Sequence, residues 1–458
     1  MNGNILAYIV LLVWPILSMR WFRVKLIQEA ILWTLLGGFL LLAVKTEIDI
    51  PMLPALGKHT MPVISVLLGC FLIKKQPVLY FQGLGKKKYL ILIFIVSPLV
   101  TSLLNPNSII IGFQFSPGLT YYDGLSDSIN RFLLIIPFFI GRRFFRTYSD
   151  QLIMFKILVS SALLYSLPML YEIRMSPQLH TWVYGYFPHS FGQQKRSSGF
   201  RPVVFIGHGL WVAFYMMVCL SASIPLWKDG IKVKQFSPAA VSYFLFIMLV
   251  LCKSMASLFY AVFLFTFIKW ISPRGQHIAA VLLVSVAMLY PAMSILNVFP
   301  HEKLLSVASS VTSNDRMQSL KFRFDNEKRL LDHAKEKFYF GWGGWGRNRV
   351  YADSGKDITV TDGQWIMTFG SFGVIGFIAE FGLLAVVVIQ ANRASKYLMI
   401  KKERNLLAAH SLLLGIVMVD QLPNATLEAW LWLLVGILLG RSEEIMNKPE
   451  NSRNLNKV

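Results

Sequence analysis

The chain has 458 residues, of which 55% are hydrophobic and only 15% are charged, and its mean hydropathy is +0.53. Ordinary soluble domains are about 45–50% apolar and about 25% charged, so this composition excludes a string of soluble domains and favours one polytopic membrane domain. The formal net charge of +21 would suit a nucleic-acid partner, but the distribution of that charge argues against one.

Apolar runs recur from one end of the chain to the other, and a helix needs about 17–25 such residues to cross a membrane. We therefore predict an all-α integral membrane domain over residues 1–445, with about thirteen transmembrane helices (12–14). Five short runs among them predict tilted or broken helices. The expected spans are 4–19, 26–44, 61–73, 89–104, 128–141, 152–171, 203–226, 238–252, 255–268, 278–298, 371–391, 406–423 and 428–440.

Basic residues gather on alternate loops, which hold more than half of the 45 Lys and Arg residues. The positive-inside rule makes these loops cytoplasmic, with the N-terminus outside and the C-terminus inside. The charge therefore reports topology, and we predict no nucleic-acid partner. The polar tail 446–458 is expected to be a disordered cytoplasmic segment. The three cysteines fall inside spans, which suggests neither a disulfide framework nor a metal cluster.

Two long charged loops remain outside, 171–201 and the larger 300–365, which carries eleven Lys and Arg residues. Within the larger loop, residues 314–338 show apolar side chains at helical spacing, which predicts an amphipathic helix. Asn314 suits its start and Gly341 its end. Such a helix would lie at the outer interface of the membrane.

Arginines in both outer loops are candidate ligands for an anionic headgroup such as a diphosphate, because guanidinium groups bind phosphate oxygens in a bidentate manner. Arg196 and Arg201 precede a span, whereas Arg316 and Arg323 lie two helical turns apart on one side of the predicted loop helix. The alternatives are interfacial anchoring for the first pair and a surface ion pair between Arg323 and Glu327.

Two further titratable residues sit near span ends. His208 is expected about one and a half turns into the span 203–226, where an ionisable group marks a functional site by default. A neutral histidine bonded between helices is the alternative. Asp362 precedes the span 371–391 and suits either a general base or a helix N-cap.

Trp342 and Trp345 belong to a run of alternating glycine and tryptophan at 341–346. Their rings suit stacking on sugars or a place at the headgroup level. The chain has no P-loop, dinucleotide fingerprint, zinc-protease motif or nucleophile elbow. It also lacks an Asp-x-Asp signature, which argues against a cytoplasmic transferase that uses nucleotide sugars.

Three elements together resemble the superfamily of O-antigen ligases and O-antigen polymerases. Arg196-Ser197-Ser198-Gly199-Phe200-Arg201-Pro202 is similar to a family segment Arg-x-x-Gly-x-x-x-Pro, with the proline one place early. Arg323 precedes Gly341 by about 18 residues, as a family arginine precedes its glycine turn. Asp362 leads a segment about eleven residues before Gly373-Val374-Ile375-Gly376. The resemblance covers about 196–384, and the N-terminal half resembles the family only in hydropathy.

The resemblance implies metal-independent glycosyl transfer without a cofactor, from a polyprenyl-diphosphate-linked glycan, at the outer face of the bacterial inner membrane. Asp362 would act as the base and Arg323 would stabilise the leaving diphosphate. The implied substrate-binding residues are Arg196, Arg201, His208, Arg316, Trp342 and Trp345. Membrane lipid, a chain-length regulator and a flippase are the implied partners.

The ligases carry histidine where this chain has Asp362, so the resemblance favours a repeat-unit polymerase. An outer-loop aspartate is also found in the peptidoglycan polymerases of the shape, elongation and division family. The alternatives are ligase-type transfer of the glycan to lipid or protein, and a transporter of lipid-linked oligosaccharides. A carrier would be expected to place charges near mid-membrane in repeated, broken helices.

Overall fold

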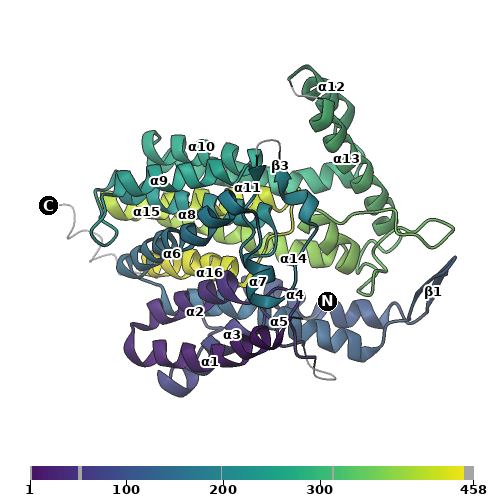
Figure 1. The fold of residues 1–458 in the computed structure, drawn as a ribbon, viewed down its shortest axis with the longest axis horizontal. Coiled ribbons are helices and arrows are strands. Elements are labelled where there is room, and N and C mark those ends of the chain that lie inside the picture. The colour runs from purple at the N-terminus through teal and green to yellow at the C-terminus, as the bar shows by residue number, and fades with distance from the viewer. Residues whose placement is uncertain (1–2, 50–53, 197–198, 312–313, 448–458) are drawn as a thin grey trace.

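The computed structural model describes residues 3–49, 54–196, 199–311 and 314–447. It is a bundle of helices (Figure 1), and strands within the described residues form only two short antiparallel pairs. The first half of the chain contains α1 (Ile5–Val24), α2 (Ile27–Leu41), α3 (Met61–Leu68), the π-helix η1 (Gly69–Ile73), α4 (Lys87–Leu103), β1 (Ile109–Ile111), β2 (Gln114–Ser116), α5 (Tyr121–Phe144), α6 (Tyr148–Met175), α7 (Leu179–Tyr184), η2 (Phe191–Gln194), β3 (Lys195–Arg196), β4 (Gly199–Phe200) and α8 (Gly209–Lys228). The second half contains α9 (Pro238–Leu251), α10 (Met255–Trp270), α11 (Pro273–Ile295), α12 (His301–Val311), α13 (Asn314–Lys335), α14 (Gln364–Ser395), α15 (Lys401–Asp420) and α16 (Ala429–Asn447).

The predicted all-α class is confirmed, and six helices in the described part are long and apolar enough to cross a membrane: α1, α5, α6, α8, α11 and α14. Four shorter apolar helices accompany them: α2, α3 with η1, α9 and α10. Each of the thirteen expected spans overlaps a helix. The number of crossings stays a prediction.

The centre of the bundle depends on close contact between α5 and α16. A Cβ on Gly436 would lie 2.0 Å from the carbonyl oxygen of Phe138, and a Cβ on Gly141 would lie 2.4 Å from that of Leu433. Small residues at such contacts let helix backbones approach where lipid gives no hydrophobic force between helices. Helix α14 packs on both α4 and α16, and α11 packs on α15.

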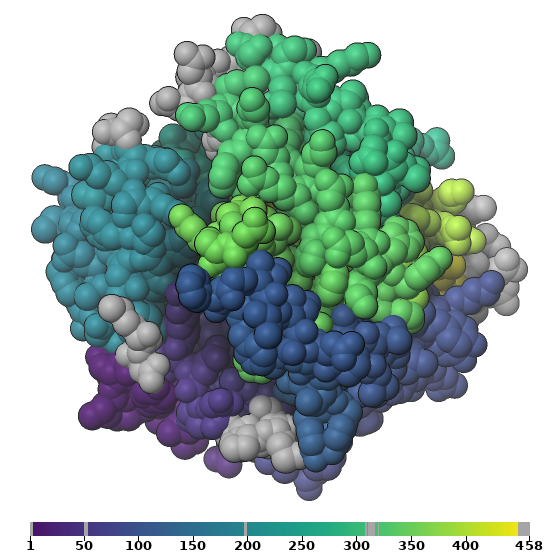
Figure 2. Space-filling model, turned by 90° about the vertical axis from the view of Figure 1, so that its right-hand side faces the viewer, coloured from purple at the N-terminus to yellow at the C-terminus, as the bar shows by residue number. Residues whose placement is uncertain are grey.

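The connecting segments gather at two ends of the bundle. At one end, the backbone N–H of Asn4 donates to the carbonyl of Tyr184, which joins the start of α1 to α7. Figure 2 looks onto this end, where the segments near 105–120, 175–200 and 300–365 lie at the surface. At the other end, basic loop residues pair with the last turns of α16, as in the ion pair between Arg146 and Glu444 at 2.9 Å.

Helix α14 is broken at Gly373, which has φ +66°. Residues 338–343 dock into the break through four backbone hydrogen bonds: Val374 N–H to Phe338 (2.8 Å), Ile375 N–H to Tyr339 (3.3 Å), Trp342 N–H to Gly370 (2.8 Å) and Gly343 N–H to Ser371 (2.9 Å). A break inside apolar surroundings needs such partners, because unpaired backbone groups are costly there. The start of the glycine–tryptophan run therefore supplies hydrogen-bond partners for backbone groups at the break, where the Gly-x-x-Gly motif begins.

The amphipathic helix expected at 314–338 is present as α13, which begins at Asn314 and ends three residues early at Lys335. Leu331 and Ala334 are buried as its apolar face predicts. The sequence analysis did not anticipate α12, which precedes it. Because α13 leads directly into the docked segment 338–343, its position relative to α14 is fixed by backbone contacts.

Candidate functional site

Two residues that are far apart in the chain meet at the start of α14. The Nε atom of Arg323 on α13 lies 3.9 Å from Oδ2 of Asp362, and both side chains are partly exposed, at 39% and 44%. Among the described residues, neither side chain makes a closer polar contact. The alternative interpretations made from sequence are wrong, since the N-cap of α14 is Gly363 and Glu327 bonds elsewhere. Among the described residues, the closest charged partner of each side chain is therefore the other.

The two residues line a cavity of about 240 Å³ between α11, α12, α13 and the start of α14. Most of its wall is apolar, with contributions from Phe299, Leu330 and Ile366. A positive and a negative group on such a wall suit an amphiphilic ligand with a charged head.

Glu327 is a third charged residue of this cavity, one helical turn beyond Arg323. The Tyr290 hydroxyl on α11 donates to its Oε1. Burial raises the pKa of the Glu327 carboxyl to about 7, an effect only partly offset by that hydrogen bond. The sequence analysis named Glu327 only as an ion-pair partner for Arg323. Glu327 is buried because α11 packs near it, and no local pattern in α13 reveals this contact.

Arg323 also lines a second cavity, of about 170 Å³, between the starts of α8 and α10 and the end of α15. Asp420 lies in its wall and accepts hydrogen bonds from Asn424 (2.8 Å) and Thr426 (3.2 Å). The Arg323 side chain therefore lines two cavities, one with a mostly apolar wall and one whose wall includes Asp420, Asn424 and Thr426.

Arg201 contacts the chain just before α10, next to the second cavity. Arg201 is buried and donates from Nε (3.2 Å) and Nη2 (2.7 Å) to the carbonyl of Lys253. The next residue, Ser254, lines the cavity that holds Arg323. Burial lowers the pKa of Arg201 to about 10, and the nearby charge of Arg196 adds to this effect. Arg201 thus fixes the segment, whereas Arg196 on β3 is exposed.

His208 does not lie inside a helix, and the expectation that it sits within a span is wrong. It is the N-cap of α8, and its Nδ1 accepts a hydrogen bond from the Leu210 N–H at 3.1 Å. Gly207 has φ +105°, and a Cβ there would lie 2.8 Å from Val44, so the chain turns before the helix begins. Burial, with the adjacent His189 and arginines, lowers the pKa of His208 to about 4. The imidazole is therefore neutral near pH 7.

The two tryptophans lie outside both cavities. Trp342 stacks on His333 at 4.5 Å and donates from Nε1 to the His333 carbonyl at 2.9 Å. Trp345 is 66% exposed, and its Nε1 donates to Asp123 at 3.0 Å. Both rings hold the loop in place, and their contact with a sugar stays a prediction. Arg316 lies in the first turn of α13, but its side chain lies outside the part that the structure describes.

Sequence reasoning missed Arg347, which connects the large loop to the β1–β2 hairpin. It is buried, and its Nη1 donates to the carbonyls of Asn107 (2.9 Å) and Pro117 (2.8 Å). A buried arginine among backbone carbonyls holds two loops together, and no spacing pattern predicts such a contact.

A second missed residue is Arg131 on α5, near the break in α14. Its guanidinium lies 4.5 Å from the Phe94 ring centroid and 3.9 Å from that of Phe372. Its Nη1 lies 3.9 Å from Glu380, which accepts hydrogen bonds from Gln364 (2.9 Å) and Thr368 (2.7 Å). These bonds give Glu380 a structural role beside the break in α14.

Comparison of the chain with family models and with curated proteins finds no match. Within the described residues, no group of three or more His, Cys, Asp and Glu side chains is placed to hold a metal ion.

Proposed function

We propose that the protein is a glycosyltransferase of the bacterial inner membrane that polymerises polyprenyl-diphosphate-linked oligosaccharide repeat units on the outer face. In this proposal all thirteen apolar helices cross the membrane, the N-terminus is outside and the C-terminus is cytoplasmic. Residues 300–365 then form an extracytoplasmic loop. The observation that supports this function is the facing pair Arg323 and Asp362 on an apolar cavity wall at the mouth of the bundle.

The geometry suits a lipid diphosphate donor. The apolar wall can accept the first isoprenoid units, while the guanidinium of Arg323, with its five N–H donors, can bind phosphate oxygens. Arg196 would add a second positive charge from the segment that Arg201 fixes. A cation already held beside the leaving diphosphate would stabilise the negative charge that develops on it.

In the proposed reaction, a hydroxyl oxygen of the acceptor sugar attacks the anomeric carbon of the donor. Asp362 takes the hydroxyl proton. The bond between the anomeric carbon and the diphosphate oxygen breaks, and its electron pair leaves with the polyprenyl diphosphate, whose charge Arg323 stabilises. Attack opposite the leaving group inverts the anomeric configuration. A chain-length regulator and a flippase would act beside this enzyme.

A transporter of lipid-linked oligosaccharides is the second candidate function. The observation that favours it is the buried pair Arg131 and Glu380 beside the break in α14, because charged groups at broken helices are typical of carriers. It ranks second because Arg131 and Glu380 line neither of the two cavities at Arg323.

The deciding experiment compares surface and lipid-linked glycans of a deletion strain with those of the parent strain, by gel electrophoresis and mass spectrometry. Single repeat units in place of long chains support the polymerase. Complete polymer that remains on its lipid carrier would show a ligase instead. Repeat units trapped on the cytoplasmic face would show a transporter, and an unchanged glycan profile would refute all three.

A further inference from the structure

A basic cavity of about 720 Å³ lies near the C-terminal ends of α5, α14 and α16, far along α14 from Asp362. Six of the residues that line it are basic: Lys86, Lys87, Arg142, Arg143, Arg146 and Arg393. One carboxylate, Glu443, lines it with them. The positive-inside rule accounts for basic residues on these loops. It does not account for their gathering in one cavity between helices.

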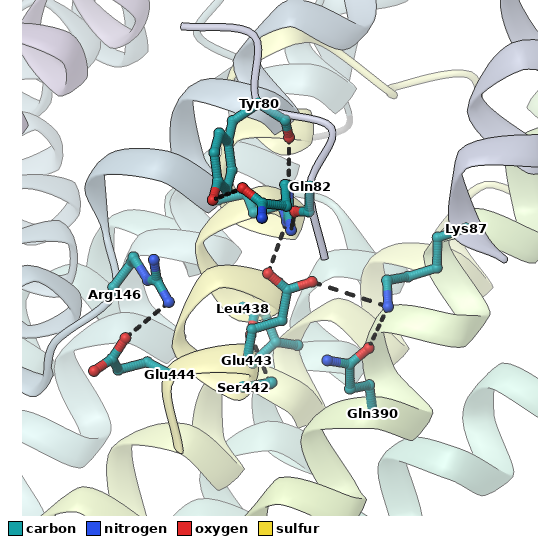
Figure 3. A network of polar contacts seen from close by, with 10 residues as sticks. Tyr80, Gln82, Lys87, Arg146, Gln390, Leu438, Ser442, Glu443 and Glu444 are labelled. Carbon is teal, nitrogen blue, oxygen red and sulfur yellow. Dashed lines mark hydrogen bonds and ion pairs between the residues drawn. The ribbon is translucent and has the colours of Figure 1, made fainter. Parts of the chain in front are cut away.

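Several residues that line this cavity belong to one network of polar contacts, shown in Figure 3. Arg142 is buried and donates to the carbonyls of Tyr80 (2.5 Å) and Gln82 (2.6 Å) and to Glu443 (2.7 Å). Lys87 lies 3.9 Å from the other oxygen of Glu443 and donates to Gln390 at 2.9 Å. A single carboxylate is therefore shared by two cations, and the network holds a net positive charge.

The remaining basic side chains of the cavity have fewer polar partners. Arg146 pairs with Glu444 at 2.9 Å. Among the described residues, Lys86, Arg143 and Arg393 have no carboxylate partner, and Arg143 only approaches the Tyr80 ring, at 5.1 Å from its centroid. Two glutamates thus face six basic side chains, and three of these are available to an anion.

One side of the cavity is apolar. Val386 and Ile389 of α14 line it and are only half-buried, although they belong to a helix long and apolar enough to cross a membrane. A positive pocket beside such a helix combines the two features of a lipid site: donors for a phosphate and a surface for acyl chains.

We propose that this cavity binds the phosphodiester headgroup of an anionic membrane lipid, with Lys86, Arg143 and Arg393 around the phosphate and the acyl chains along Val386 and Ile389. A free phosphate ion would gain the charge contacts but would leave the apolar side uncovered. The lipid would link α14 to α5 and α16 at the end of the bundle remote from Arg323. This inference does not depend on the proposed function.

The test uses the full chain purified in mild detergent. Native mass spectrometry measures binding of added phosphatidylglycerol, with phosphatidylcholine as the neutral lipid. The site variant combines Lys86→Gln, Arg143→Gln and Arg393→Gln. The matched control combines Lys232→Gln, Lys234→Gln and Arg274→Gln, which removes three basic residues from another loop and from the start of α11, on the same predicted side.

We expect the site variant to bind phosphatidylglycerol about fivefold more weakly for each charge removed, and the control to bind it as the parent does. Equal weakening in both variants would overturn the proposal, since it would show general surface attraction. Displacement of the lipid by millimolar inorganic phosphate would also overturn it, in favour of an ion site. If the triple variant does not fold, Arg393→Gln alone is measured against Lys232→Gln by the same criteria.

Discussion

Arg323 and Asp362 face each other across 3.9 Å with only a loose ion pair between them. A structural salt bridge would be shorter and would satisfy more of the guanidinium donors. The separation instead leaves room for a ligand oxygen near both groups. Exchange of either residue should therefore affect activity far more than stability.

We expect Asp362→Asn and Arg323→Lys each to lower polymer formation by about 10²–10³-fold, the usual loss for a group that acts on developing charge. Full-length glycan in a complemented deletion strain, resolved on gels, is the readout. The matched control is Arg349→Ala, because Arg349 forms a 2.7 Å pair with Asp357 in the same loop. Wild-type glycan from both site variants would exclude the proposed roles.

Gly373 should not tolerate a side chain. Its φ of +66° is unfavourable for other residues, and a Cβ would lie 2.2 Å from the carbonyl carbon of Tyr339. Gly373→Ala should destabilise the fold by more than about 2 kcal/mol, measured as thermal unfolding in detergent. Gly382→Ala in the same helix is the control, because its nearest neighbour would lie 3.8 Å away. Equal stability of the two variants would contradict the broken helix.

Glu327 should make stability depend on pH. Burial raises its carboxyl pKa from 4.5 to about 7, so the folded protein binds this proton more tightly than the unfolded chain does. The resulting stabilisation is complete below the unfolded pKa and is lost as the pH rises through about 7. Glu327→Gln should therefore remove part of the fall in melting temperature between about pH 5 and pH 8.

Tyr290, Arg323 and Asp362 line the same cavity as Glu327, and all of them stay in the variant. The difference between the two melting curves thus isolates Glu327. A variant that loses stability with pH as steeply as the parent would show that this carboxyl does not titrate in the window.

Arg347 should hold the β1–β2 hairpin against the large loop. Arg347→Met keeps the length of the side chain but leaves the carbonyls of Asn107 and Pro117 without their donor, so we expect a loss of about 1–3 kcal/mol. Limited proteolysis should then cut near the exposed Phe113 sooner than in the parent. Arg349→Met is the control, and equal cleavage in both variants would argue against this role.

Cysteine labelling can test the predicted sidedness, because Cys70, Cys219 and Cys252 are all buried. Phe113 is 98% exposed at one end of the bundle, and Lys232 is exposed in a predicted cytoplasmic loop. In spheroplasts, Phe113→Cys should react with an impermeant maleimide, whereas Lys232→Cys should react only after lysis. The opposite labelling pattern would show that the predicted orientation in the membrane is inverted.

Sequence patterns located the helices well, because apolar runs reflect burial in lipid or protein directly. The family resemblance pointed to Arg323 and Asp362, which the structure places 3.9 Å apart. Sequence patterns failed for His208, since Gly207 and a contact with Val44 end the extended segment where hydropathy suggests helix. Glu327, Arg131 and Arg347 depend on long-range packing, and no periodicity within their own segments reveals it.

The docking of 338–343 into the break of α14 has a consequence for protein engineering. The segment 300–365 completes the hydrogen bonding of a bundle helix, so it is not an autonomous module. Expressed alone, it would lose the partners of its backbone groups and the surface that orders α13. Grafting it onto a homologous bundle would succeed only if the recipient carried a matching interruption in the same helix.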